Sequence, residues 1–184
     1  YRTLRSLGRW DEALAEMHAF VEFARDQDQR TGRYTMYESG IFDLGETYAA
    51  LGDYDQAWDY HVQSLTVARE HIARTEHDAR LEATPSLKVV EGTAATLLPR
   101  FDALSGLAAA KGDMEAAWDY HNQATELLAD YFRHECKERG LNVSASASLV
   151  DLCLAVVADG GAHESPVVKV REHVLREARL HRLD

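Results

Sequence analysis

A stretch of about ten residues occurs twice in this chain, and this internal repeat constrains the fold more than any other feature. Residues 52–61 (GDYDQAWDYH) return as residues 112–121 (GDMEAAWDYH), and residues 8–14 (GRWDEAL) are a looser third copy. Repetition at intervals of tens of residues is typical of arrays in which each copy is one supersecondary unit packed against the next. The repeat therefore predicts a stack of similar units.

The sequence between the repeats favours helices. Apolar residues recur at helical spacing nearly everywhere, and no segment alternates with the two-residue period of a strand. The chain of 184 residues has only three prolines, so long stretches rich in Ala, Leu and Glu are uninterrupted. We expect an all-α fold with eight helices, over residues 1–7, 10–28, 34–51, 54–77 or beyond, 87–111, 114–138, 144–158 and 166–181.

Glycines mark the turns of the predicted hairpins, at Gly8, Gly52, Gly112 and residues 160–161. Asp53, Asp113 and Ser165 occupy predicted N-cap positions, and Pro166 follows Ser165 as a first helical residue. We expect Pro99 to kink or divide its helix, and residues 71–85 to be either a helix extension or a loop. The whole chain then forms one domain of about 3.5 to 4 antiparallel hairpins, with units near residues 1–31, 32–86, 87–140 and 141–184.

The charge balance excludes some classes of partner. The formal net charge is −11, which opposes binding to a phosphate backbone, and the basic residues between 169 and 182 are best explained as a solvated helix face. No apolar run reaches the roughly 18 residues of a membrane span. Cys136 and Cys153 lie in apolar helical context, which indicates buried free thiols and a cytoplasmic protein. Because the chain opens mid-pattern, we expect it to be a piece of a longer protein.

The residues at the turns resemble a known repeat family. The run LGxxY at residues 44–48, followed by GDYxxA at residues 52–57, resembles the tetratricopeptide repeat (TPR), and residues 104–117 repeat it with Ser105 in place of the small glycine. The resemblance implies an α-solenoid of antiparallel hairpins, in which Gly45, Ala57 and Ala117 are small because two helices approach closely. The long repeat interval is similar to that of TPR-like sensor domains in bacterial regulators.

The resemblance also implies a ligand site on the concave face. Tyr34, Tyr37 and Phe42 form an aromatic run at its entrance, with core packing as the alternative. Arg2 and Arg5 can pair with a ligand carboxylate. Phe42 and Glu46 stand where the family's clamp for a C-terminal Glu-Glu-Val-Asp peptide needs Lys and Asn, so that specificity is not supported. The expected groove residues are Arg2, Arg5, Tyr34, Ser39, Phe42, Glu46, Ala49, Asp102, Gly106 and Ala109.

Signals for chemistry are sparse. His61 and His121 occupy equivalent places in two units, each two residues after an Asp, and repeat inheritance explains them as well as a metal site does. No metalloprotease motif, phosphate-binding loop or nucleophile elbow occurs. The sequence therefore predicts a non-catalytic scaffold, without cofactor, that binds a protein or peptide. Homo-oligomerisation stays open. The alternatives are a sensory or oligomerisation domain of a bacterial transcriptional regulator, and a metal-dependent enzyme using His61 and His121.

Overall fold

The computed structural model describes residues 1–32, 35–79, 87–144 and 146–158. All regular secondary structure in these ranges is helical, as the sequence predicts. The seven helices are α1 (Arg2–Ser6), α2 (Trp10–Thr31), α3 (Thr35–Leu51), α4 (Tyr54–Ala79), α5 (Leu87–Ala110), α6 (Met114–Glu138) and α7 (Leu149–Ala158). Within them no helix is both long enough and apolar enough to cross a bilayer.

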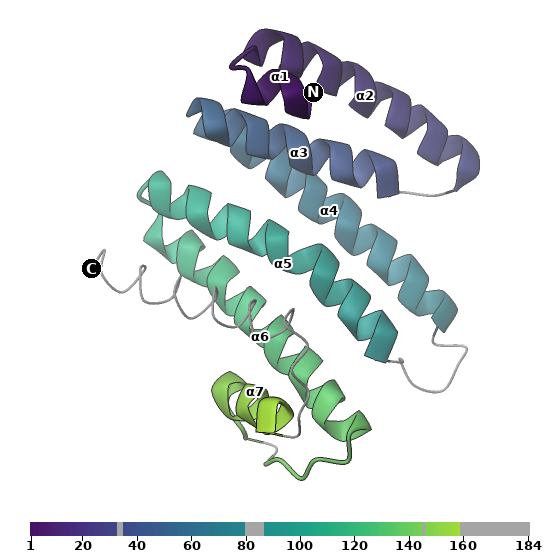
Figure 1. Cartoon of the computed structure of the whole chain (residues 1–184), viewed down its shortest axis with the longest axis vertical. Coiled ribbons are helices and arrows are strands. Elements are labelled where there is room, and N and C mark those ends of the chain that lie inside the picture. The colour runs from purple at the N-terminus through teal and green to yellow at the C-terminus, as the bar shows by residue number, and fades with distance from the viewer. Residues whose placement is uncertain (33–34, 80–86, 145, 159–184) are drawn as a thin grey trace.

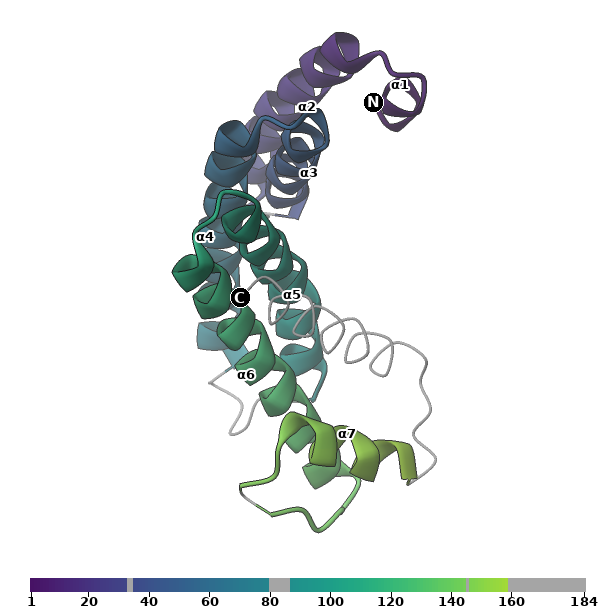
Figure 2. The ribbon, with the colours of Figure 1, turned by 90° about the vertical axis from the view of Figure 1, so that its left-hand side faces the viewer.

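Helices that follow one another in the chain also lie side by side in space. Every consecutive pair from α1 to α7 is in contact, and successive helices run back and forth as a layered stack (Figure 1). Viewed from the side, the stack is an arc (Figure 2). Helices α1, α3, α5 and α7 lie on its concave side, and α2, α4 and α6 form its outer layer. The odd-numbered helices thus present one shared inner surface.

The repeated glycine-aspartate pairs make the same turn twice. Gly52 and Gly112 have φ of 79° and 80°, the left-handed region that side chains disfavour. The amide of Gly52 donates to the Ala49 carbonyl and that of Asp53 to the Tyr48 carbonyl, which is the Schellman pattern that ends a helix. The Asp53 carboxylate then accepts from the backbone amide of Gln56, 3.2 Å away, and so caps α4.

The second copy reproduces these bonds. The amides of Gly112 and Asp113 donate to the carbonyls of Ala109 and Ala108, and Asp113 accepts from the Ala116 amide at 3.0 Å. The predicted caps at Asp53 and Asp113 are therefore confirmed. The similar sequences of residues 52–61 and 112–121 therefore correspond to turns with the same hydrogen bonds.

Small residues allow α3 and α4 to approach closely. A Cβ atom on Gly45 would lie 2.7 Å from Nε2 of His61, so no larger residue fits there without movement of the imidazole ring. In the next hairpin Ser105 takes the equivalent place and donates to the Ala117 carbonyl at 2.9 Å. Ala57 and Ala117 are fully buried, which confirms the expected close packing at these positions.

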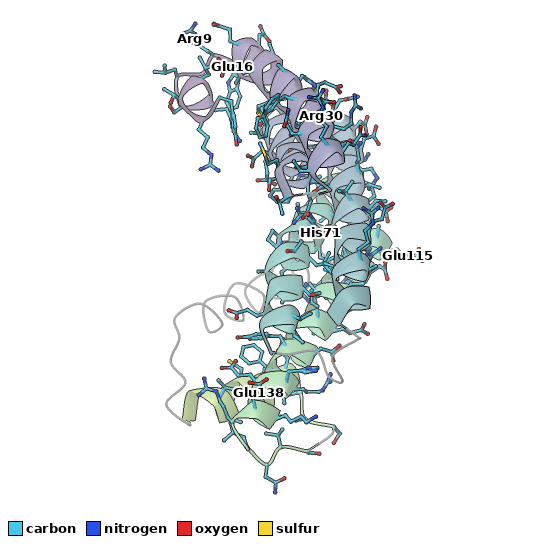
Figure 3. The ribbon with its side chains drawn as sticks, turned by 90° about the vertical axis from the view of Figure 1, so that its right-hand side faces the viewer. Arg9, Glu16, Arg30, His71, Glu115 and Glu138 are labelled. Carbon is cyan, nitrogen blue, oxygen red and sulfur yellow. The ribbon has the colours of Figure 1, made fainter. Side chains whose placement is uncertain are left out.

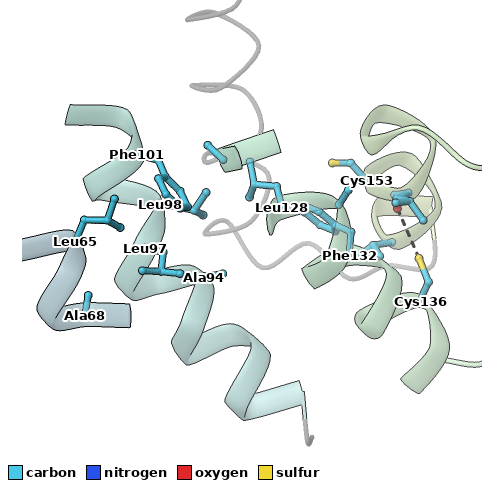
Figure 4. Close-up of a cluster of buried hydrophobic side chains, with 14 of the residues drawn as sticks. Leu65, Ala68, Ala94, Leu97, Leu98, Phe101, Leu128, Phe132, Cys136 and Cys153 are labelled. Atoms are coloured by element: carbon cyan, nitrogen blue, oxygen red, sulfur yellow. Dashed lines mark hydrogen bonds between the residues drawn. The ribbon is translucent and has the colours of Figure 1, made fainter. Parts of the chain in front are cut away.

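The largest apolar cluster joins α4, α5, α6 and α7. Its buried members include Leu65, Phe101, Leu128 and Phe132 (Figure 4). Cys136 and Cys153 are both buried and free, as predicted, and burial raises the pKa of each thiol. The Cys136 thiol points to the Leu152 carbonyl, 3.8 Å away, across the α6–α7 contact. A smaller cluster around Met17, Val21, Ile41 and Leu44 holds α2 against α3.

Trp58 and Trp118 are both half-buried. Trp58 reaches the next hairpin, where its ring meets Tyr120 edge-on at 5.9 Å. Trp118 packs beside Ala108 and Ala117 and meets His121 edge-on at 5.4 Å. Both tryptophans therefore serve packing, but only Trp58 is seen between two successive hairpins in the described part of the chain.

Several boundaries differ from the sequence prediction. Pro99 does not divide α5, because the helix continues through it from Leu87 to Ala110. Helix α4 extends to Ala79, so the first part of the segment 71–85 is a helix extension. The predicted start of α7 at residue 144 is wrong, since the helix begins at Leu149. Ser148 and Asp151 cap that start reciprocally, and Ser144 bonds locally to the Ser146 amide, which competes with helix formation. The predicted helix 166–181 lies outside the described residues.

Candidate functional site

Most of the expected groove residues come from the helices of the concave side. Arg2 and Arg5 come from α1, Ser39, Phe42 and Glu46 from α3, and Asp102 from α5, and these three helices share the inner surface of the arc (Figure 2). Arg2, Ser39 and Glu46 are exposed, whereas Arg5, Phe42 and Asp102 are half-buried. Tyr34 lies outside the described residues. Within this surface, two interaction networks involve the expected residues.

The first network links α1 to α3. The Tyr1 hydroxyl donates to the Asp43 carboxylate. Arg2 lies close to this pair, and its own pKa is raised mainly by the Tyr1 side chain and then by the charge of Asp43. Arg2 therefore already interacts with Tyr1 and Asp43 within the chain.

The second network is centred on His61. This side chain is fully buried on α4, and its Nε2 atom lies 3.4 Å from Oε1 of Glu46. The contact is close but poorly aligned, so neither ring nitrogen has a hydrogen-bond partner among the described residues. The facing imidazole lowers the pKa of Glu46, burial opposes this effect, and Arg5 lowers the pKa further as the weakest contribution. Glu46 is therefore an ionised carboxylate at neutral pH, with 46% of its side chain exposed.

Phe42 lies between His61 and Arg100. The Phe42 ring meets the His61 ring edge-on with centroids 5.0 Å apart, and the Arg100 guanidinium carbon is 5.1 Å from the Phe42 centroid. Phe42 and Glu46 are one helical turn apart on α3 and share a face. The structure thus sets an aromatic ring beside a carboxylate at the middle of the concave side.

A buried polar cluster that the sequence analysis missed lies behind Phe42. Nη2 of Arg100 is 2.6 Å from Oε1 of Glu38, and both side chains are less than a tenth exposed. The Arg100 Nε atom donates to the Ser64 hydroxyl at 2.9 Å, and Nη1 donates to the Thr96 carbonyl. Nδ1 of His71, labelled in Figure 3, lies 3.4 Å from the other Glu38 oxygen. The cluster ties α3, α4 and α5 together.

A signal for this cluster exists in the sequence. Glu38 precedes Ile41 and Gly45 at helical spacing, and Arg100 lies between Leu97 and Leu104 in the same way. Charged residues in such apolar rows are almost never buried unless they are paired. The sequence therefore contained enough information to predict that Glu38 and Arg100, which are opposite charges in the apolar rows of two helices, pair with each other.

Small residues cover the exposed face of α5. Gly92, Ala95 and Pro99 are exposed at one-turn intervals, and Gly106 is exposed two turns after Pro99. A Cβ atom on Gly92 or Gly106 would meet nothing within 4 Å. Helices α4 and α6 pack against other sides of α5, and these positions are exposed in the described part of the chain.

The two histidines of the metal alternative have different surroundings. His61 lies over Gly45 and beside Phe42, whereas His121 lies edge-on to Trp118. In the ranges that the structure describes, no group of three or more His, Cys, Asp or Glu side chains has an arrangement that could hold a metal ion. The site residues offer one imidazole and one carboxylate together, at His61 and Glu46.

Nucleophilic chemistry has little support in the buried cluster. Ser64 is fully buried, and its hydroxyl oxygen both accepts from Arg100 and lies 3.4 Å from the Glu38 carbonyl to which it donates. A serine nucleophile needs a free hydroxyl beside a base and access to substrate. Ser64 meets neither need.

Comparison with known proteins gives no further assignment. No protein-family model matches the chain, and no curated protein has a significantly similar sequence.

Proposed function

We propose that this chain is a non-catalytic, TPR-like binding module that holds a segment of a partner protein along its concave side. One observation carries the proposal. The inner helices α3 and α5 together carry the exposed Ser39 and Glu46, the half-buried Phe42, and a row of small residues that are exposed in the described part of the chain. Together the two helices offer hydrogen-bonding groups and space for close approach within one surface.

The repeat geometry supports the TPR-like assignment. The Schellman bonds and aspartate caps at Gly52 and Gly112 are equivalent in successive hairpins, and so are the buried Ala57 and Ala117. Equivalent turns give successive hairpins the same shape, and stacking of such hairpins creates the extended concave surfaces that repeat proteins use for binding. The buried free thiols of Cys136 and Cys153 fit a reducing cytoplasm, where we place the protein.

The composition of the concave surface supports an extended or helical peptide as ligand. Small side chains on α5 let a second backbone come near, so that backbone and side-chain groups of the ligand reach Ser39 and Glu46 on α3. Phe42 supplies the aromatic contact that typically contributes strongly at protein interfaces. Because Arg2 of α1 already interacts with Tyr1 and Asp43, we expect α3 and α5 to contribute more to affinity than α1.

Selection from a random peptide library tests this function. The immobilised protein is panned against phage-displayed random peptides, and enriched sequences are synthesised and titrated by fluorescence anisotropy. We expect Phe42→Ala and Glu46→Arg to weaken binding about tenfold or more, Arg2→Glu to have a smaller effect, and Glu115→Gln to have none. Glu115 is exposed at the start of α6 on the convex side and serves as the matched control (Figure 3). Failure to enrich any peptide, or equal affinity in all variants, contradicts the proposal.

A further inference from the structure

We infer that Glu46, which lies beside the buried imidazole of His61, is the contact for a lysine or arginine side chain of the bound segment. This inference rests on the proposed function and specifies the partner's chemistry: a segment with a basic residue at one fixed position. Glu46 is the acceptor, and His61 is a positioning residue that does not itself touch the ligand.

The first step concerns the rigidity of His61. Its ring is fully buried and lies directly on the backbone of Gly45, where even a single added methyl group would be 2.7–2.9 Å from ring atoms. The Phe42 ring meets its other side edge-on. An imidazole enclosed in this way has little rotational freedom, so its Nε2 atom is a fixed point toward Glu46.

The second step concerns the carboxylate. Glu46 follows Gly45 directly, and its Oε1 atom is 3.4 Å from the His61 Nε2 atom. The side chain is nearly half exposed, so the carboxylate is free to accept hydrogen bonds from the concave side. Its lowered pKa means that it carries full negative charge at neutral pH.

The third step selects the partner group. A long basic side chain can pack its apolar stem on an aromatic ring and keep its charged end in contact with a carboxylate. Phe42 lies one turn before Glu46 and is half-buried, which places ring and carboxylate in that relation. The chain's net charge of −11 attracts a cationic segment and repels an acidic one. The close charged contact of Glu46 in the described part of the chain is with His61, and Arg5 of α1 acts on it only as a weaker charge.

The test uses the same peptide selection and measures whether the enriched peptides prefer Lys or Arg at one aligned position. Wild-type protein, Glu46→Gln, His61→Leu, His61→Gln and the convex-side control Glu115→Gln are panned in parallel. We expect the peptides enriched by wild-type protein and by Glu115→Gln to share Lys or Arg at one aligned position, and those enriched by Glu46→Gln to lack it. His61→Leu should reduce the preference, and His61→Gln, which restores a polar donor, should return it.

Titration of one enriched peptide makes the test quantitative. We expect the peptide to bind Glu46→Gln about tenfold more weakly than wild type, and a version with methionine in place of its basic residue to bind both proteins equally. Enriched wild-type peptides without a basic position, or a preference that survives Glu46→Gln, overturn the inference while leaving the proposed function intact. Absence of any enriched peptide contradicts the proposed function itself. Circular dichroism checks that each variant is folded. If His61→Leu does not fold, the result for Glu46→Gln alone tests the inference.

Discussion

Arg100 of α5 and Glu38 of α3 form an ion pair across the junction of two hairpins, with Nη2 and Oε1 separated by 2.6 Å. Helices α3 and α5 otherwise touch sparingly, because each packs mainly against other helices, including α4. Burial lowers the pKa of Arg100, and the charge of Glu38 opposes that shift. The pair therefore links the inner helices of successive hairpins directly beneath the candidate site.

Breaking this pair should destabilise the fold strongly. In Glu38→Ala the buried guanidinium of Arg100 loses its only carboxylate at hydrogen-bond distance among the described residues, and a buried charge without its partner costs about 3–5 kcal/mol. Urea unfolding followed by circular dichroism measures the loss. The double variant Glu38→Leu/Arg100→Met, which removes both charges, should recover most of the stability.

The exposed pair of Lys111 and Asp55 is the control for this measurement. Its Nζ and Oδ1 atoms are also 2.6 Å apart, but Asp55 is largely in solvent and Lys111 is about one third exposed. We expect Asp55→Ala to change the free energy of unfolding by less than about 1 kcal/mol. Similar losses for Glu38→Ala and Asp55→Ala would show that burial of the inner pair has no energetic importance.

Two helical glycines should respond to alanine with opposite signs. Gly45→Ala places a methyl group 2.7 Å from His61 Nε2, and overpacking of this kind costs about 1–3 kcal/mol, more than the helix propensity gained. Gly106→Ala meets nothing within 4 Å and should stabilise the protein by roughly 0.5–1 kcal/mol. Thermal unfolding of both variants measures the difference. A stabilising Gly45→Ala would mean that His61 moves aside easily, which would also weaken its assigned role beside Glu46.

The repeat made the hairpin turns predictable because their bonds are local. Gly52, Asp53, Gly112 and Asp113 each act on residues within one turn of the chain, so their types alone indicate the geometry. The effect of Pro99 on α5 was harder to predict, because it depends on residues that are distant in the sequence. The neighbouring Arg100 donates to the Thr96 carbonyl of the preceding turn and pairs with Glu38 of α3.

The candidate site was predictable only at the level of helix faces. The helical register placed Phe42 and Glu46 on one surface of α3, where the structure has them. What the sequence could not indicate is which distant residues complete that surface. His61 was considered for metal binding because His121 occupies the equivalent place in the next repeat. In the structure the His61 ring lies against Gly45. This contact could be predicted only if the packing of α3 against α4 were known.

The aspartate cap of α6 should contribute measurably to stability. The Asp113 carboxylate accepts from the Ala116 amide, one of the amides that has no partner inside the helix. We expect Asp113→Ala to cost about 1 kcal/mol and Asp113→Asn to cost much less, because asparagine retains an accepting oxygen. Denaturant titration of the two variants measures both values. Equal losses would indicate that charge at the helix start, and not the hydrogen bond, is the stabilising feature.

Alkaline pH should destabilise the protein through Tyr131. Burial first, and then the charges of Glu135 and Glu91, raise the pKa of this phenol to about 12. Since the folded state holds the proton more tightly than the unfolded state, the contribution is complete below the unfolded value of about 10 and is lost as pH rises through about 12. Tyr131→Phe cannot ionise, so its unfolding free energy should fall less between these values than that of wild type, as measured by urea unfolding at several pH values. Tyr54, which is exposed at the start of α4, provides the matched control, and Tyr54→Phe should follow wild type. Parallel pH profiles for wild type and Tyr131→Phe would contradict the assignment of the raised pKa to Tyr131.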